Sequence, residues 1–190
     1  MNDARSRRCF LGLALGTVAG SATTVAAQGT EGGSEAVGKA LAEATRRNRS
    51  RQMEDQAAYG KDLVQRFGTD VVEVIRETSI RRAREWTQEA GTSRDLDEVQ
   101  KMLWDHLGPD FAYEVLERSP TRVRYKVTRC PYAEGMRKLD AAELGFAYNC
   151  AFDIGFCEGL NPEMRFIRTR TLMEGHDHCD HTYELAKTSR

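Results

Sequence analysis

The sequence predicts an α+β domain: an antiparallel four-stranded sheet of two hairpins, packed against helices and preceded by a helical N-terminal part. Two observations lead to this prediction. Apolar residues recur at helical spacing through the first half of the chain. The period then changes to two between Phe111 and Val127, and again after Arg165, as is typical of strands. Helices grouped before pairs of strands favour an α+β class.

The first residues have the pattern of a twin-arginine export signal. Ser6-Arg7-Arg8-Cys9-Phe10-Leu11 places paired arginines before a moderately apolar run, and Val25-Ala26-Ala27 closes that run with small residues. A membrane span needs about twenty strongly apolar residues, whereas glycines and threonines interrupt this run. We therefore expect a cleaved signal peptide over residues 1–27, the twin-arginine export machinery as a partner, no stable membrane span after cleavage, and a periplasmic or secreted protein. An uncleaved membrane anchor is the alternative.

The mature chain is expected to begin with a flexible leader. Residues 28–35 are rich in glycine and polar side chains, and they precede a single domain of residues 36–190. From about Ala36 to Trp86 the chain is expected to form a helix or a pair of helices, with an apolar stripe in its later part.

A further helix and a hairpin are expected next. The helix runs from about Leu96 to Leu107, because Asp95 and Glu98 make a capping box ahead of an apolar stripe. Ser119-Pro120-Thr121 then turns the chain between two segments that alternate in polarity. The residues expected to face inward are Phe111, Tyr113 and Val115 on the first strand, and Val123, Tyr125 and Val127 on the second.

The last part of the chain repeats this order. Two helical segments are expected, from about Tyr132 to Leu139 and from Ala141 to Glu158, where Asn161-Pro162 breaks the pattern. A second hairpin is expected from strands at Arg165 to Met173 and Cys179 to Ala186, joined by Gly175-His176-Asp177-His178.

Charge and cysteine content narrow the possible functions. A net charge of −1 at pH 7 offers no general attraction for nucleic acid or for an anionic membrane. An oxidising periplasm would allow the cysteines of the mature chain to form disulfides, whereas folding in the cytoplasm before export leaves free or metal-ligating thiols equally open. These cysteines are Cys130, Cys150, Cys157 and Cys179.

The residues that could carry chemistry gather near the C-terminus. Cys150, Asp153 and Cys157 share one stripe of an expected helix, and a carboxylate on an apolar face needs a partner or a function. On the last expected strand, Cys179 and His181 share the inward face with apolar neighbours. These groups could ligate zinc or iron, or could pair a cysteine nucleophile with a histidine base.

The same region resembles a known family. Cys130-Pro131-Tyr132, Cys150 with Asp153, Arg168-Thr169-Arg170-Thr171-Leu172, Gly175 and Cys179-Asp180 resemble the L-2-amino-thiazoline-4-carboxylic acid hydrolase family over roughly residues 50–186. The resemblance implies hydrolytic opening of a small ring that contains sulfur and nitrogen. The chain departs from the family pattern in its histidine-rich loop and in His181, where an aromatic residue is more usual. Export is also unexpected for a cytosolic amino-acid pathway, so another substrate remains open.

We therefore expect a hydrolase that opens a small cyclic amidine, amide or thiazoline, with a small molecule as its substrate. Cys150 is expected as nucleophile or thiol ligand, Asp153 as base or orienting acid, and Cys179 with His181 as the facing pair. The residues expected to contact the substrate are Cys130, Tyr132, Asn161, Arg168 and Arg170.

Two other functions stay open at this point. The alternative is a non-catalytic periplasmic domain that binds a metal or a small ligand through its cysteine and histidine cluster. Zinc is then a candidate cofactor, although the glycine-flanked loop is more typical of a turn. Candidate metal ligands are His176, His178, Cys179 and His181. A structural domain held by two disulfides is a third reading.

Overall fold

The computed structural model describes residues 31–89 and 91–186. The chain divides into two units, residues 1–37 and 38–190, and the sheet and the candidate site belong to the second. The expected signal peptide, residues 1–27, and the first part of the expected leader, residues 28–30, lie outside the described residues. Within the described ranges, no helix has the length and apolar character that crossing a membrane requires.

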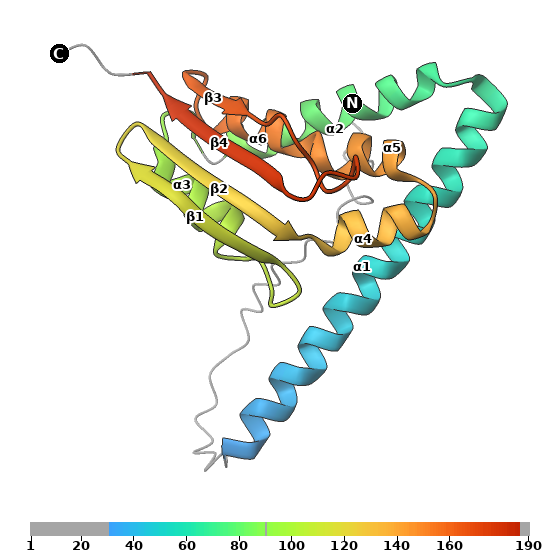
Figure 1. The fold of residues 1–190 in the computed structure, drawn as a ribbon, viewed down its shortest axis with the longest axis horizontal. Coiled ribbons are helices and arrows are strands. Elements are labelled where there is room, and N and C mark those ends of the chain that lie inside the picture. Colours follow the sequence, from blue (N-terminus) through green and yellow to red (C-terminus); the bar gives the residue numbers. More distant parts are fainter. Residues whose placement is uncertain (1–30, 90, 187–190) are drawn as a thin grey trace, which may run out of the picture. The chain divides into compact units, whose positions relative to one another are not determined.

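Two helices form the stretch expected to be helical from Ala36 to Trp86. Helix α1 (Glu31–Phe67) ends at Gly68, whose φ of 86° favours a residue without a side chain, and helix α2 (Asp70–Gln88) follows (Figure 1). Residues 31–35, expected in the flexible leader, are helical, because a helix that has nucleated gains one hydrogen bond for each residue added.

The helix expected from Leu96 to Leu107 is present but changes its winding. Helix α3 (Leu96–Val99) begins at Asp95, whose carboxylate accepts hydrogen bonds from the amides of Asp97 and Glu98, as the predicted cap requires. A π-helical turn, η1 (Gln100–Trp104), follows, and the amide of Asp105 reaches back five residues to the carbonyl of Gln100.

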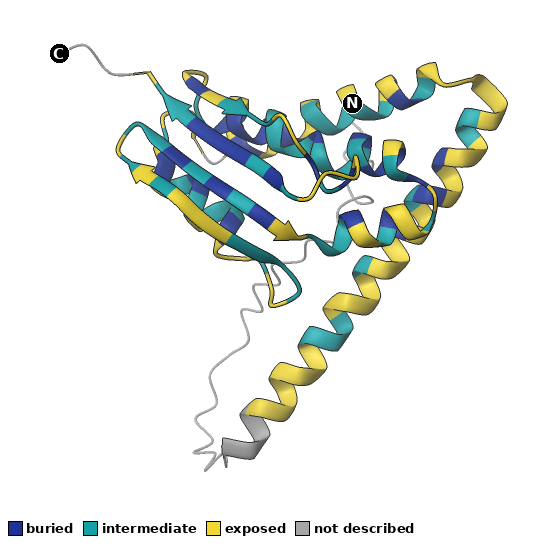
Figure 2. Ribbon diagram, viewed as in Figure 1, coloured by how far each residue is buried: buried dark blue, intermediate teal, exposed yellow. Residues whose placement is uncertain are grey.

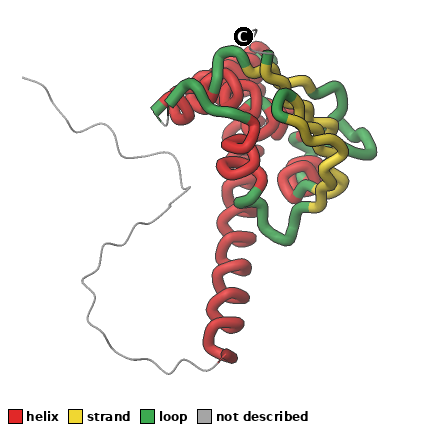
Figure 3. The backbone as a smooth tube through the Cα atoms, turned by 90° about the vertical axis from the view of Figure 1, so that its left-hand side faces the viewer, coloured by secondary structure: helices red, strands yellow, loops and turns green. Residues whose placement is uncertain are grey.

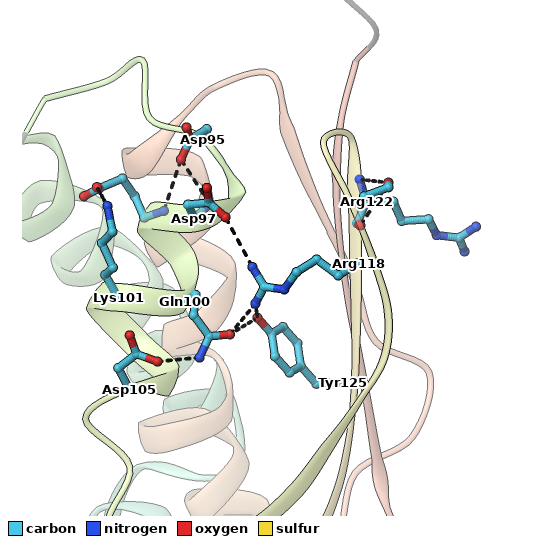
Figure 4. A network of polar contacts seen from close by, with 10 residues as sticks. Asp95, Asp97, Gln100, Lys101, Asp105, Arg118, Arg122 and Tyr125 are labelled. Carbon is cyan, nitrogen blue, oxygen red and sulfur yellow. Dashed lines mark hydrogen bonds and ion pairs between the residues drawn. The ribbon is translucent and has the colours of Figure 1, made fainter.

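Polar contacts join this π-turn to the sheet (Figure 4). The Oε1 atom of Gln100 accepts from the Tyr125 hydroxyl at 2.6 Å and from Arg118 Nη2 at 2.6 Å, while its Nε2 donates to Asp105 Oδ1 at 2.5 Å. Burial raises the pKa of Tyr125 to about 12, so its hydroxyl remains a donor. Tyr125 also stacks on Trp104, with ring centroids 3.9 Å apart, so these contacts hold the π-turn η1 against the sheet.

The predicted four-stranded antiparallel sheet is confirmed, and its order is β1-β2-β4-β3. The strand expected from Arg165 to Met173 is wrong in length, because it ends at Ile167. The backbone amides of Thr169 and Arg170 bind the carboxylate of Asp180, at 2.9 and 2.6 Å, instead of continuing the ladder. The strands are β1 (Ala112–Ser119), β2 (Arg122–Arg129), β3 (Met164–Ile167) and β4 (Cys179–Leu185).

The two strands of the first hairpin differ in how well they match the predicted alternation. In β2 every predicted inward residue is buried, as Figure 2 shows for alternate positions along the strand. In β1 the prediction for Val115 is wrong, since its side chain is 46% exposed. The register with β2 shifts in a bulge after Val115, between Val115 and Glu117. Val115 itself pairs with the buried Tyr125, and it is exposed because β1 is an edge strand, with a neighbouring strand on one side only.

Helices connect β2 to β3, and they also contain a π-turn. The single helix expected from Ala141 to Glu158 is interrupted where the amide of Ala151 donates to the carbonyl of Phe146 at 2.9 Å, five residues back. The elements are α4 (Pro131–Lys138), α5 (Ala142–Gly145), η2 (Phe146–Cys150) and α6 (Phe152–Leu160).

Helix α6 packs unusually close to helix α2. A Cβ atom added to Gly155 would lie 1.9 Å from the carbonyl oxygen of Ile80, so only glycine allows this approach. Beyond this contact the strands form one layer beside the helices (Figure 3). The core between α3, η1, α6 and the sheet consists of Leu96, Val99, Trp104, Val123, Tyr125, Val127, Phe156, Cys157, Leu160, Met164, Cys179 and Tyr183.

Candidate functional site

A buried ion pair links helix α6 to the segment after β3. Asp153 Oδ2 accepts a hydrogen bond from Arg168 Nη1 at 2.6 Å and lies 3.4 Å from His181 Nε2. The side chains of Asp153, Arg168 and His181 are only 16%, 5% and 10% exposed. The inward direction predicted for Asp153 is therefore confirmed, and its partners are a cation and an imidazole.

The charge state of Asp153 follows from these partners. Burial acts to raise the pKa of this carboxyl, but the hydrogen bond with His181 and the positive charge of Arg168 outweigh burial and hold the pKa below its usual range. The Asp153 charge likewise keeps the pKa of Arg168 above its ordinary value, although burial opposes it. Both groups are therefore ionised at neutral pH, and Asp153 acts as an acceptor that orients its neighbours.

Arg168 does not lie on an exposed strand face. It follows β3 directly, its Nη2 donates to the carbonyl of Cys150 at 2.9 Å, and its Cζ lies 5.5 Å from the ring centroid of Phe146 and 5.1 Å from that of Phe166. All these contacts point into the domain. Arg170, by contrast, is 55% exposed and lies 3.9 Å from Asp177.

The four cysteines within residues 31–89 and 91–186 are all free thiols. Burial raises the pKa of Cys130, Cys150 and Cys157, and it raises that of Cys179 to about 11. Cys130, Cys150 and Cys179 lie close enough for ionisation of one to raise the pKa of another. The structure thus brings three of the predicted site residues together as neutral thiols.

A cavity of about 380 Å³ opens beside these thiols. Cys130 is part of its wall, and so is Leu172, whose backbone amide donates to the sulfur of Cys179 at 3.2 Å. The other lining residues are Arg129, Ala133, Glu134, Arg137 and Lys138. The cavity is therefore small and its wall is largely basic. It contacts the Cys130 thiol directly, and Leu172 links it to the Cys179 thiol.

Two of the basic lining residues differ in their freedom to bind a ligand. Arg129 donates to the backbone carbonyls of Asp110 and Pro109, at 2.8 and 2.5 Å. Arg137 makes one long contact, 3.4 Å, with the carbonyl of Leu172. Arg129, Arg137 and Lys138 were not identified from the sequence, because basic residues at a strand end and on a helix are usually solvated. Their proximity to Cys130 in the sequence was the signal that could have indicated a site.

The remaining predicted site residues are not part of the cavity wall. Asn161 follows α6, and its Oδ1 accepts a hydrogen bond from the amide of Glu163 at 2.9 Å, which makes it part of a turn. Its Nδ2 donates to the carbonyl of Arg94 at 2.9 Å. Tyr132 lies in the first turn of α4. His178 Nδ1 lies 2.8 Å from Asp177 Oδ1 in the loop before β4.

The described residues contain no group of three or more histidine, cysteine, aspartate or glutamate side chains arranged to hold a metal ion. The histidine-rich loop that includes His176 therefore provides no such group there. What the site offers instead is a basic cavity, neutral thiols and a buried ion pair.

A comparison with protein families identifies the family to which this chain is similar. A family model described as L-2-amino-thiazoline-4-carboxylic acid hydrolase matches residues 18–183, a span that begins earlier than the resemblance over roughly residues 50–186. A search of curated proteins finds no match to this chain.

Proposed function

The chain belongs to the L-2-amino-thiazoline-4-carboxylic acid hydrolase family, and from that premise we propose that it hydrolyses a small ring of the thiazoline, cyclic amidine or cyclic amide type that carries a carboxylate. Family membership implies a hydrolase in general. What we propose beyond this is the kind of ring that is opened and the bond that is broken.

The observation that carries this proposal is the position of Cys130 in the wall of the basic cavity. A volume of about 380 Å³ fits a small molecule. Arg137 and Lys138, both exposed on α4, can attract a substrate carboxylate toward this wall. Of the free cysteines, Cys130 is the one that lines the cavity, so we assign it the role of nucleophile; Cys150, predicted for that role, remains a candidate behind it.

The chemistry requires one water molecule for each ring opened. The Cys130 thiol first gives its proton to solvent, and the thiolate adds to the ring carbon that is bonded to both heteroatoms. The bond from that carbon to a ring heteroatom then breaks as the heteroatom takes a proton from solvent. Water then adds to the same carbon, the bond to the Cys130 sulfur breaks, and the thiol is restored. Asp153 and Arg168 do not reach the substrate in this scheme; they hold the chain around Cys150 in place.

The test uses 2-amino-thiazoline-4-carboxylic acid and the same ring without its carboxylate. The wild-type chain should open the first and open the second poorly. Cys130→Ser should abolish turnover, and Cys157→Ala, which removes a buried thiol away from the cavity, is the matched control. Full turnover by Cys130→Ser would refute the nucleophile. Binding without turnover by the wild-type chain would favour the ligand-binding alternative.

We also propose that the protein acts after export by the twin-arginine route. This rests on Arg7 and Arg8 ahead of the apolar run, which lie outside the described residues.

A further inference from the structure

Arg49 is a charged residue that is largely buried although it belongs to the long helix α1. Its side chain is 11% exposed, and its Nη2 donates to Asp110 Oδ2 at 2.6 Å. Arg46, one turn earlier on the same helix, also faces Asp110, but at 3.6 Å and with 44% of its side chain exposed. Burial of a guanidinium has a cost unless its surroundings compensate it, so the position of Arg49 calls for an explanation.

Two aromatic rings surround this guanidinium. The Cζ atom of Arg49 lies 5.8 Å from the ring centroid of Phe111 and 5.9 Å from that of Tyr132, and the two rings are 6.2 Å apart. Tyr132 lies in the first turn of α4, two residues after Cys130. Asp110 on one side and the rings on the other therefore fix a positive charge at the start of α4.

We propose that Arg49 is a positioning residue for Cys130: its fixed positive charge, held over Tyr132 in the first turn of α4, favours the thiolate form of the cysteine that precedes this helix. The inference rests on the proposed function, in which Cys130 is the nucleophile. A cation beside a cysteine, together with the amides at a helix N-terminus, stabilises a thiolate. The partial burial of Arg49 strengthens this effect, because the charge is less screened by water than that of an exposed arginine.

The groups around Cys130 act in opposite directions. Burial is the largest influence and raises the pKa of the thiol, whereas the backbone amides of Ala133 and Tyr132 lower it. The charge of Asp153 raises the pKa, and the charge of Arg49, a smaller influence, lowers it. Arg49 thus limits a rise in pKa that would otherwise leave less thiolate. The other titratable or charged groups at this place are Cys150, Cys179, Arg129, Glu134, Arg137 and Lys138.

The experiment measures how fast Cys130 of the full chain reacts with iodoacetamide as a function of pH. Mass spectrometry of the tryptic peptide of residues 130–137 isolates this thiol from the others. Arg49→Met should slow the reaction near neutral pH by up to about tenfold, the effect of one pKa unit on the thiolate fraction. Arg46→Met, the matched control, should leave the profile where it is in the wild type.

A second variant should change the alkylation rate of Cys130 in the opposite direction. Asp110→Asn removes the counter-charge and leaves Arg49 in place, so alkylation of Cys130 near neutral pH should become faster. This variant keeps the test decisive even if Arg49→Met does not fold. Unchanged profiles, equal effects of Arg49→Met and Arg46→Met, or slower alkylation in Asp110→Asn would overturn the inference. Alkylation needs no substrate, so failure of the proposed hydrolysis would not be confused with failure of this role.

Discussion

Replacing Asp153 by asparagine is expected to destabilise the folded chain strongly, and the size of the effect follows from the buried ion pair. The substitution nearly preserves the volume of the side chain but removes the charge that Arg168 contacts at 2.6 Å. Since the Arg168 side chain is only 5% exposed, water cannot replace the lost partner. Removing one member of a buried pair costs about 3–5 kcal/mol, because the other charge is left uncompensated.

Thermal unfolding followed by circular dichroism measures this cost. For a chain of this size, each kcal/mol lowers Tm by about 2–4 °C, so Asp153→Asn should unfold about 6–20 °C below the wild type. Glu158→Gln is the matched control on the same helix: it removes the partner of Arg84 in a pair whose side chains are 45% and 42% exposed. Exposed pairs contribute about 0–1 kcal/mol, so the control should stay within a few degrees of the wild type.

The difference between wild type and Asp153→Asn should also depend on pH. Because the folded-state pKa of Asp153 lies below its ordinary value of 3.8, the pair contributes fully above that value, and the contribution is lost as pH falls through the folded-state pKa. The gap in Tm should therefore be constant near neutral pH and close in acid. Equal Tm values for Asp153→Asn and Glu158→Gln, or a gap that does not close in acid, would refute the reasoning from the buried pair.

Two further predictions concern export and the thiols. Changing Arg7 and Arg8 to lysine should leave uncleaved precursor in the cytoplasm, as fractionation and immunoblotting would show, and an unchanged periplasmic yield would exclude the twin-arginine route. The four described cysteines should all react with a thiol reagent after unfolding without reductant; a disulfide found by peptide mapping, above all between Cys150 and Cys157, would contradict the geometry of α6.

The fold class could be predicted because its signals are local. Alternation of Val123, Tyr125 and Val127 marks a half-buried strand whatever lies around it, and Asp95 caps a helix through its own backbone neighbours. The exposure of Val115 depends on the place of β1 at the edge of the sheet, which the alternating pattern around this residue does not contain. The end of β3 depends on Asp180, more than ten residues later in the chain, so the sequence around Ile167 could not indicate it.

The candidate site was predictable only where a residue broke a pattern. Asp153 could be recognised because a carboxylate interrupted an apolar stripe. Arg168 could not be placed, because its burial depends on contacts with Asp153 and Phe146, which lie on helical segments earlier in the chain. Neither the basic residues of the cavity wall nor the burial of Arg49 could be predicted, because the sequence does not distinguish a buried arginine from a solvated one.

The π-turn η2 bears on how many residues related chains have between Phe146 and Cys150. A wide turn accommodates one residue more than an α-helical turn, so it behaves as an insertion that leaves the flanking helices in phase. Here the amide of Ile154 donates to Ala151, and the carbonyl of Cys150 is left for Arg168. A relative that is one residue shorter between Phe146 and Cys150 would keep α6 in the same orientation but would lose this unbonded carbonyl. A single-residue gap at this place in an alignment would therefore mark chains in which the arginine needs a different hydrogen-bond acceptor.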